Sequence, residues 1–554
     1  MSKREEGDDG RIPFRIRIGV TGHKGVGGSE RRAVVREQVK RVHDLLHSSR
    51  TGIRLAAISQ LAEGADRLVA WQVLEEGWER GHEARLEALL PFERERYAEI
   101  QEFGHESREE FDRLFELSVV RREQRGARGD TPAEREEAFE AAGRQLVGRC
   151  DVLIALWDGK KSRGRGGTAA TLLYAASSAK PCIWIATEDL AVRDNFEHGE
   201  PEPFYREVAR RAQPDEVAEE NFEEAPDALA ALRESLTAFD EFNRQSIDAA
   251  DESAAGELAV AVKAGRWVAA PYARAGELAG RWQWRFKWMA RTITLLAALA
   301  AVMLATGLAF SPEEPIWTEV EAVLFFLALA GSFLVRRVGF HRRWLSYRVL
   351  AERLRSARFL APTGADFRRQ ARLESVFAGG RSTAWLMRAF EEVWDRRPPL
   401  PKPPAEMSDS EFDRLRRLLA DRWIGAQIEY HEKKSEHHRR WHRRLTSLVV
   451  LLFAATIAFA ILHSKHVWEE ASVFFSIALP AAGASLGVLL TVNQHQALSE
   501  RYTRMKSDLT IARRNLLDAP PDSLDRVSSE AARVIAQETG AWFGSMWFLD
   551  IEHP

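Results

Sequence analysis

Small and polar residues that suit phosphate binding occur in three clusters within the N-terminal third of the chain. Each cluster follows a stretch of branched and apolar residues that is typical of a buried strand. Glycine lets the backbone approach a ligand closely, threonine donates a hydroxyl and lysine supplies positive charge. The candidate nucleotide-binding residues are Thr21, Gly22, His23 and Lys24; Gly64, Ala65 and Asp66; and Asp158, Gly159, Gly166, Gly167 and Thr168.

The stretches before these clusters predict an alternating α/β fold. Each is followed by turn residues, and most then by a helical stretch such as Arg31–Leu46, Ala65–Glu76 or Ala169–Ala176. This alternation predicts a Rossmann-like parallel sheet with helices on both faces. Ligands of such sheets bind at the carboxyl ends of the strands, close to helix N-termini. The candidate strands are Phe14–Val20, Ile53–Ile58, Leu86–Leu90, Val152–Trp157 and Cys182–Ala186.

Each cluster also has an explanation without a ligand. Glycines after strands often only form turns, His23 suits a solvated loop, and Asp66 is a favourable charge at a helix N-terminus. Three clusters at strand ends of one domain favour a nucleotide or another phosphate-containing small molecule over three unrelated turns. We expect no cofactor besides that ligand.

The order of these motifs resembles the SLOG superfamily. This is the Rossmann-like group that contains the DNA-processing protein fold and the LOG cytokinin-activating enzymes. The resemblance covers Ile18–Ala186 and implies a nucleotide sensor, to which we assign residues 1–190. It rests on Gly19-Val20-Thr21-Gly22-His23, Gly64-Ala65-Asp66-Arg67-Leu68, Leu90-Pro91-Phe92 followed by Tyr97, Leu156-Trp157-Asp158-Gly159 and Gly166-Gly167-Thr168-Ala169.

One residue departs from the LOG enzymes, whose Pro-Gly-Gly-x-Gly-Thr-x-x-Glu loop ends in a catalytic glutamate. At the equivalent spacing after Thr168, this sequence has Thr171. Hydrolysis of an N-glycosidic bond needs a group that activates water or stabilises the oxocarbenium-like state. The missing acid favours binding without turnover, and we assign no catalytic residue. Asp66 and Asp158 stay open as substitutes for it.

Four apolar stretches in the rest of the chain predict membrane-spanning helices. A span needs about 17–25 apolar residues, and Glu321 is the only ionisable residue inside these stretches. The alternative, buried helices of a soluble domain, does not explain their strongly basic flanks. With so few ionisable groups in the spans, selective transport is not expected. The stretches are Thr292–Phe310, Val320–Val335, Leu445–Leu462 and Ala471–Val492.

Basic residues gather on one side of all four stretches. The turns 311–319 and 463–470 hold Lys465 as their only fixed positive charge. The positive-inside rule therefore predicts a multi-pass protein of the inner (cytoplasmic) membrane, with both termini in the cytosol. Cys150 and Cys182 then lie in a cytosolic domain, where disulfides are rare, and we interpret them as small buried hydrophobes.

The four spans form two hairpins, which we interpret as two similar modules. Tyr347-Arg348 with Ala351–Arg355, and Gln427–His431, resemble SLATT-type two-span effector modules. The segment Ala273–Trp288 predicts a helix that runs into the first span. We divide the chain after the sensor into a helical linker (191–280), a first module (281–397), a proline-rich linker (398–407) and a second module (408–554).

The module helices carry patterns for close contacts. An apolar stripe follows the last span, and Gly483 and Gly487 have the spacing that lets two membrane helices touch. Both patterns fit contacts within one chain or between subunits, and we expect a homo-oligomer. The basic segment His437–Arg444 suits anionic headgroups, so we expect neither nucleic acid nor a metal there. The stripe consists of Leu498, Tyr502, Met505, Leu509, Ala512 and Leu516.

Two functions fit these features. In the first, the SLOG-like domain senses a nucleotide-derived second messenger and the spans then disrupt the membrane or form a pore. The combined resemblance is similar to predicted bacterial conflict systems, which include antiphage defence. In the second, the protein is a membrane-anchored, LOG-like nucleotide-processing enzyme. The sequence favours the first, because a single span would suffice as an anchor.

Overall fold

A computed structural model describes residues 10–26, 28–46, 51–124, 129–161, 164–213, 228–246, 266–365, 384–398 and 403–548. These residues form two compact units. The first, here called the α/β unit, comprises the described residues between 11 and 246. The second, the helical unit, comprises Gly10 and the described residues from 266 onward.

The α/β unit is built on a seven-stranded sheet with the strand order β4-β3-β2-β1-β5-β6-β7. All neighbouring strands run parallel except β6 and β7. The central strand β5 has the sequence Val-Leu-Ile-Ala-Leu-Trp and is buried along its whole length, as expected for a parallel strand covered on both faces. The strands are β1 (Phe14–Gly22), β2 (Ile53–Ser59), β3 (Arg85–Leu90), β4 (Val120–Glu123), β5 (Val152–Trp157), β6 (Cys182–Ala186) and β7 (Val192–Asp194).

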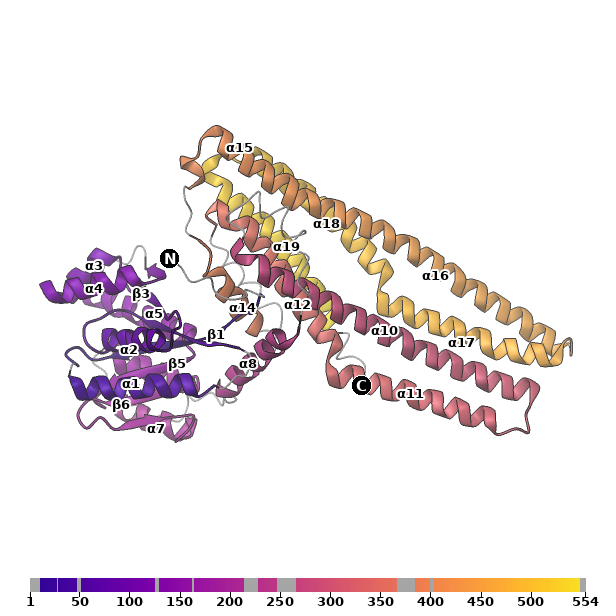
Figure 1. The fold of residues 1–554 in the computed structure, drawn as a ribbon, viewed down its shortest axis with the longest axis horizontal. Helices are drawn as coiled ribbons and strands as arrows, with labels where there is room; N and C mark the ends of the chain where they lie inside the picture. Colours follow the sequence, from indigo (N-terminus) through magenta and orange to yellow (C-terminus); the bar gives the residue numbers. More distant parts are fainter. Residues whose placement is uncertain are drawn as a thin grey trace. The chain divides into compact units, whose positions relative to one another are not determined.

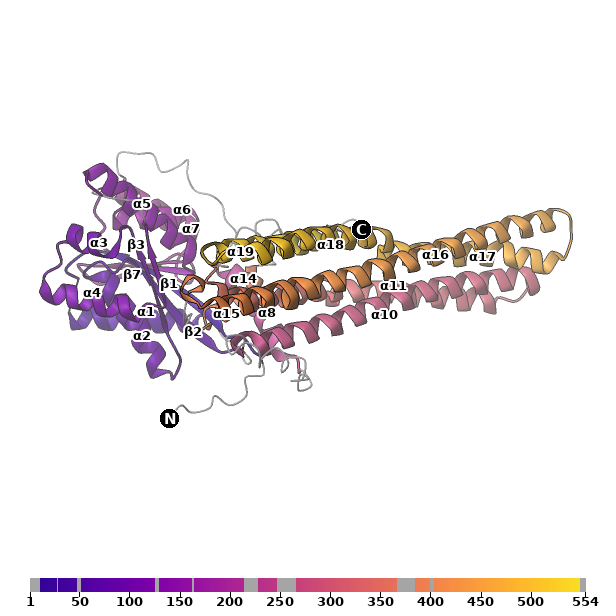
Figure 2. The same cartoon turned by 90° about the horizontal axis from the view of Figure 1, so that it is seen from above.

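Helices cover both faces of this sheet, as Figure 2 shows, with α1 and α2 on one side and α5, α6 and α7 on the other. The parallel Rossmann-like fold predicted from the sequence is therefore confirmed. Cys150 and Cys182 are buried and unpaired, and burial raises the pKa of the Cys150 thiol to about 12. The helices are α1 (Ser29–Asp44), α2 (Ala65–Glu79), α3 (Arg94–Gln101), α4 (His105–Leu117), α5 (Pro132–Arg149), α6 (Thr168–Ser177), α7 (Pro201–Ala212) and α8 (Ala228–Arg244).

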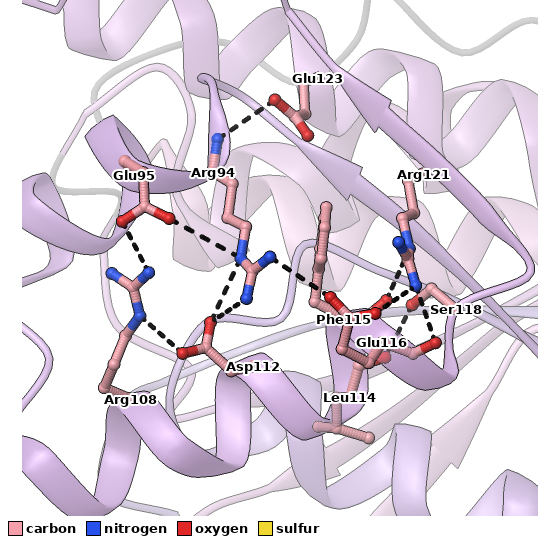
Figure 3. A network of polar contacts seen from close by, with 10 residues as sticks. All are labelled: Arg94, Glu95, Arg108, Asp112, Leu114, Phe115, Glu116, Ser118, Arg121 and Glu123. Carbon is pink, nitrogen blue, oxygen red and sulfur yellow. Dashed lines mark hydrogen bonds and ion pairs between the residues drawn. The ribbon is translucent and has the colours of Figure 1, made fainter.

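The two edge strands, β4 and β7, were not predicted. Strand β4 has the sequence Val-Arg-Arg-Glu, and polar contacts rather than burial hold it in place (Figure 3). Arg94 and Arg121 lie over the ring of Phe115, at 4.8 and 5.0 Å from its centroid. Arg121 also donates to the carboxylate of Glu116. An apolar pattern could not reveal a strand of this kind.

The region between the last β strand and the first span is divided between the two units. Helix α8 belongs to the α/β unit, where Phe239 packs edge-on against Phe14 of β1. Asn243 accepts from the backbone N–H of Ile12 at 3.0 Å and donates to its carbonyl oxygen at 2.9 Å. Helix α10 (Arg266–Phe310) belongs to the helical unit and includes the predicted segment Ala273–Trp288.

The helical unit contains four helices that are long and apolar enough to cross a membrane. They are the leading helices α10 and α16 (Ala426–Ser464) and the second spans α11 (Ile316–Val338) and α17 (Glu469–Asn493). Each contains one predicted stretch, so the four spans and two hairpins are confirmed (Figure 1). The other elements are α12 (Phe340–Leu360), Ala361–Thr363, α14 (Ala384–Trp394), Pro404–Glu406, α15 (Asp409–Arg417), the π-helix Leu418–Gly425, α18 (His495–Asp518), Pro521–Ser523 and α19 (Leu524–Phe548).

Two predicted contact patterns lie within the chain. The stripe of α18 packs against α16, α19 and the π-helix, and Met505, Leu509 and Leu516 in it are buried. Gly483 of α17 faces α16, since a Cβ there would lie 3.3 Å from the ring of Phe453. The four-residue glycine spacing therefore serves at least partly for contact inside one hairpin.

Candidate functional site

The strand order places a topological switch point between β1 and β5. From β1 the chain proceeds outward through β2, β3 and β4, and it returns to the other side of β1 to form β5 and β6. The carboxyl ends of β1 and β5 are paired through Thr21 with Ala155 and Gly22 with Leu156. Open α/β sheets bind ligands in the crevice outside the strand ends at such a point. The first predicted cluster, after β1, and the start of the third, after β5, border this point.

The first two clusters are in direct contact. A Cβ on Gly22 would lie 2.2 Å from the Cβ of Ala65, so only glycine allows the first turn of α2 to reach β1. Gly64 has φ of +95°, and its would-be Cβ lies 2.6 Å from the carbonyl oxygen of His23. That oxygen accepts from the N–H of Ala65 at 3.2 Å. These glycines therefore serve close backbone contact between the β1 loop and α2.

His23 and Asp158 span the switch point. The Nε2 atom of His23 lies 3.1 Å from Oδ1 of Asp158, which also accepts from the backbone N–H of Lys160 at 3.0 Å. Partial burial raises the pKa of Asp158, but the Lys160 hydrogen bond and the His23 ring outweigh it and hold the pKa below its usual value. The pair thus places an ionised carboxylate and an imidazole where the two strands end. Lys24 is exposed beside it, with Nζ 3.4 Å from the carbonyl oxygen of Gln101.

Asp66 is buried and contacts its own loop. Its carboxylate receives hydrogen bonds from the backbone of Gln60 and Ala62, and the hydroxyl of Ser59 lies 3.4 Å from Oδ2. Burial nevertheless raises the pKa of this carboxyl to about 7. The position of Asp66 therefore accounts for the shape of the loop between β2 and α2.

The titration of Asp66 predicts a pH-dependent stability. The carboxyl titrates near 3.8 when unfolded and near 7 when folded, so the folded chain binds one more proton between these values. Stability should then fall as pH rises through this window, by roughly 2 to 3 kcal/mol between pH 5 and 7. Asp66→Asn keeps an acceptor for the loop and should remove this fall. The free energy of unfolding of the full-length parent and of the Asp66→Asn protein is measured in urea, with hydrogen exchange of the β2 amides as the signal for unfolding. An equal pH dependence in the two would assign the titration to another group.

The third cluster packs against α5. A Cβ on Gly166 would lie 2.3 Å from the Cβ of Phe139. Gly167 is exposed and is the N-cap of α6, which starts at Thr168 and has no side-chain cap. Because α6 follows β5, its free N–H groups lie at the carboxyl edge of the sheet. Among the described residues, the contacts of Gly166, Gly167 and Thr168 do not join this part of the cluster to His23 or Asp158.

Thr171 occupies the position at which LOG enzymes carry their glutamate. It is buried on α6, and a Cβ on Gly143 of α5 would lie 2.8 Å from its hydroxyl oxygen. The larger side chain of a glutamate would meet α5 here. The environment of residue 171 thus agrees with the absence of an acid.

The predicted site residues did not include the glycines at the end of the loop after β1. Gly25 and Gly28 have φ of +72° and +116°, and nothing lies within 4 Å of a Cβ at either position. Gly28 is the N-cap of α1 and again provides no side-chain cap. The signal was present, because glycines recur between His23 and Ser29. The start of α1 offers open backbone next to the switch point.

A separate hollow of about 350 Å³ lies at the edge of the sheet. None of the predicted site residues lines it. Its lining residues are Leu89, Leu90, Arg121, Arg122, Glu123, Gln124 and Gln145. We place the candidate site at the switch point instead, because the Arg121 guanidinium is already paired with Glu116.

Comparison with known protein families bears on the helical unit. Residues 419–542 match the SMODS and SLOG-associating 2TM effector domain 1. The match covers most of the π-helix, all of α16, α17 and α18, and most of α19. It points to a transmembrane effector of conflict systems, as the SLATT resemblance of the second module implied. No curated protein and no solved structure matches the chain.

Proposed function

We propose that the protein is a membrane effector of bacterial antiphage or related conflict systems, activated when its α/β unit binds a nucleotide-derived signal. The observation that carries the proposal is the union in one chain of a matched two-span effector domain and an α/β unit with polar loops at its switch point. On binding, the spans disrupt the bilayer.

Both termini lie in the cytosol, so green fluorescent protein fused after Pro554 should fluoresce in bacterial cells.

The chemistry of the switch point supports a phosphate-containing ligand. Two uncapped helix starts, at Gly28 and Gly167, offer free N–H groups and the positive end of a helix dipole. Lys24 is exposed and can approach a phosphate, while His23 can donate a hydrogen bond. The ionised Asp158 suits a sugar hydroxyl rather than a phosphate, because it would repel a second anion. A nucleotide supplies both groups.

A membrane-anchored nucleotide-processing enzyme is the second candidate. The pairing of His23 with Asp158 at 3.1 Å favours it, since a carboxylate and an imidazole are common acid and base groups. The burial of Thr171 at the glutamate position of LOG enzymes weighs against hydrolysis by the LOG mechanism.

Dye-loaded liposomes that contain the full chain separate the two candidates. They are incubated with a panel of mononucleotides, dinucleotides and cyclic oligonucleotides, and both dye release and the nucleotides are measured. We expect at least one compound to raise the release rate severalfold and to be recovered unchanged. Consumption of a nucleotide without dye release would favour the anchored enzyme. Neither release nor consumption with any compound would reject nucleotide sensing.

A further inference from the structure

The two hairpins follow the same course through the helical unit. In each, a leading helix is followed by a second span, by one residue in the left-handed conformation and by a helix that returns along the leading helix. The left-handed residues are Gly339, with φ of +67°, and Gln494, with φ of +43°. The return helices are α12 and α18, and Figure 2 shows α18 running beside α16.

The left-handed residues define a common numbering for the second spans and return helices. They are 155 positions apart, 494 minus 339. This offset aligns buried Ala328 of α11 with buried Gly483 of α17. It also pairs similar residues on α12 and α18, namely Tyr347 with Tyr502, Leu350 with Met505, Leu354 with Leu509, and Ala357 with Ala512.

For the leading helices the offset is one residue larger, because the first turn, 311–315, is one residue longer than the second, 465–468. Two contacts agree with this value of 156. The ring centroids of Trp282 and Phe340, the residue after the first left-handed position, are 5.4 Å apart, and those of His438 and His495, after the second, are 5.0 Å apart. Near the turns, Gly307 meets Trp317 as His463 meets Ser472.

The four spans lie in a row in the order α11, α10, α17, α16, which can be followed in Figure 1. Helix α10 packs against α11 and α17, and α17 packs against α10 and α16. Among the described residues, α11 has extensive contact with one other span, α10, and α16 likewise with one other span, α17. In terms of the repeat, second spans and leading helices alternate along the row. The contact between hairpins therefore joins a leading helix, α10, to a second span, α17.

We propose that a second copy of this chain continues the row, so that α16 of one copy packs against α11 of the next. These two helices are the repeat counterparts of α10 and α17, whose contact the chain already makes. A leading helix ends the row on one side and a second span ends it on the other, so the two edges are complementary rather than alike. Such head-to-tail contacts close into rings when the rotation between copies permits. The proposal does not depend on nucleotide sensing.

Exposure differs in the way this proposal requires. Ala305 of α10 is fully buried, whereas its counterpart Ile461 on α16 is 52% exposed. Ala478 of α17 is 7% exposed, whereas its counterpart Val323 on α11 is 58% exposed. Helices α10 and α17 run antiparallel, and the rings of Phe310 and Phe474 are in contact. Ala305 lies about one turn before Phe310 and Ala478 about one turn after Phe474, so the two alanines lie at a similar level of the helix pair. Ile461 and Val323 should therefore meet between copies.

Charges at the two edges are also complementary. The ring centroids of Phe310 and Phe474 are 5.9 Å apart, near the helix ends that adjoin the turns. The counterparts of these phenylalanines are His466 and Glu319, and Lys465 precedes the histidine. All three are exposed. The ring of His466 already pairs with the carboxylate of Glu469 in the same chain, so Glu319 on α11 would face Lys465, just after the end of α16, in the next copy.

Cysteine crosslinking in membranes tests the contact. Two differently tagged full-length chains are co-expressed, one with Ile461→Cys and the other with Val323→Cys, and the membranes are oxidised. The native Cys150 and Cys182 are buried and stay in place. We expect a disulfide dimer that carries both tags, and a ladder of larger species when one chain carries both substitutions. Phe325→Cys is the matched control, since residue 325 is exposed on α11 but lies about 200° around the helix from residue 323. Paired with Ile461→Cys, it should crosslink only at background level.

Three outcomes would overturn the proposal. Dimers formed by either single variant with itself would indicate two-fold rather than head-to-tail contact. A disulfide within one doubly substituted chain would mean that the row closes on itself. Background crosslinking in every combination, with the variants still in the membrane fraction, would mean that lipid covers both edges.

Discussion

Gly167→Asp is expected to abolish binding of a phosphate-containing ligand while the α/β unit stays folded. Gly167 is exposed, and its φ of −79° and ψ of 173° suit any residue. Aspartate is a favoured N-cap and should stabilise α6 by up to about 1 kcal/mol. Its carboxylate would face a bound phosphate, and two like charges about 4–5 Å apart near a protein surface repel by roughly 3 kcal/mol. Binding should weaken about a hundredfold, measured by calorimetry with a compound that releases dye.

Gly167→Asn provides the matched control. Asparagine has nearly the same size and is an equally good N-cap, but it carries no charge. It should keep most of the affinity of the parent, and liposomes containing it should still release dye. If the two variants bind alike, the ligand does not approach the start of α6, and the site is restricted to the His23 and Asp158 side of the switch point.

Gly22→Ala is expected to destabilise the α/β unit by about 3 kcal/mol, the upper range for overpacking of a core. The new methyl group would lie 2.2 Å from the Cβ of Ala65 and 3.1 Å from the carbonyl oxygen of Leu156. Either α2 or the end of β5 must therefore move. Since the end of β5 borders the switch point and the start of α2 contacts the β1 loop, ligand binding should weaken as well. Urea unfolding of the purified full chain, with hydrogen exchange of β1 and β5 amides, measures the loss.

Gly52→Ala serves as the control in the same sheet. It precedes β2, and nothing lies within 4 Å of a Cβ there. The substitution should change stability by less than about 0.5 kcal/mol. A Gly22→Ala protein as stable as this control would show that α2 shifts without cost, and the close contact would then not explain the glycine.

The sequence alone predicted the elements that burial or lipid determines locally. A stretch as apolar as Leu445–Leu462 with basic flanks has one stable state in a membrane, a helix that satisfies its own backbone. The run of β5 is apolar throughout, which requires a strand covered on both faces. For the same reason the glycines and polar residues after such strands could be assigned to one edge of the sheet before their contacts were known.

Only the tertiary structure decided features that depend on residues far apart in the chain. Strand β4 is held by arginine contacts with α4, Asp66 is buried in its own loop, and Thr171 is buried against Gly143 of α5. The row of spans is a further case, because membrane helices are apolar on every side and their sequences do not specify their neighbours. Local patterns report whether a residue is buried, whereas its partner is set by how the elements pack, and that choice depends on the whole chain.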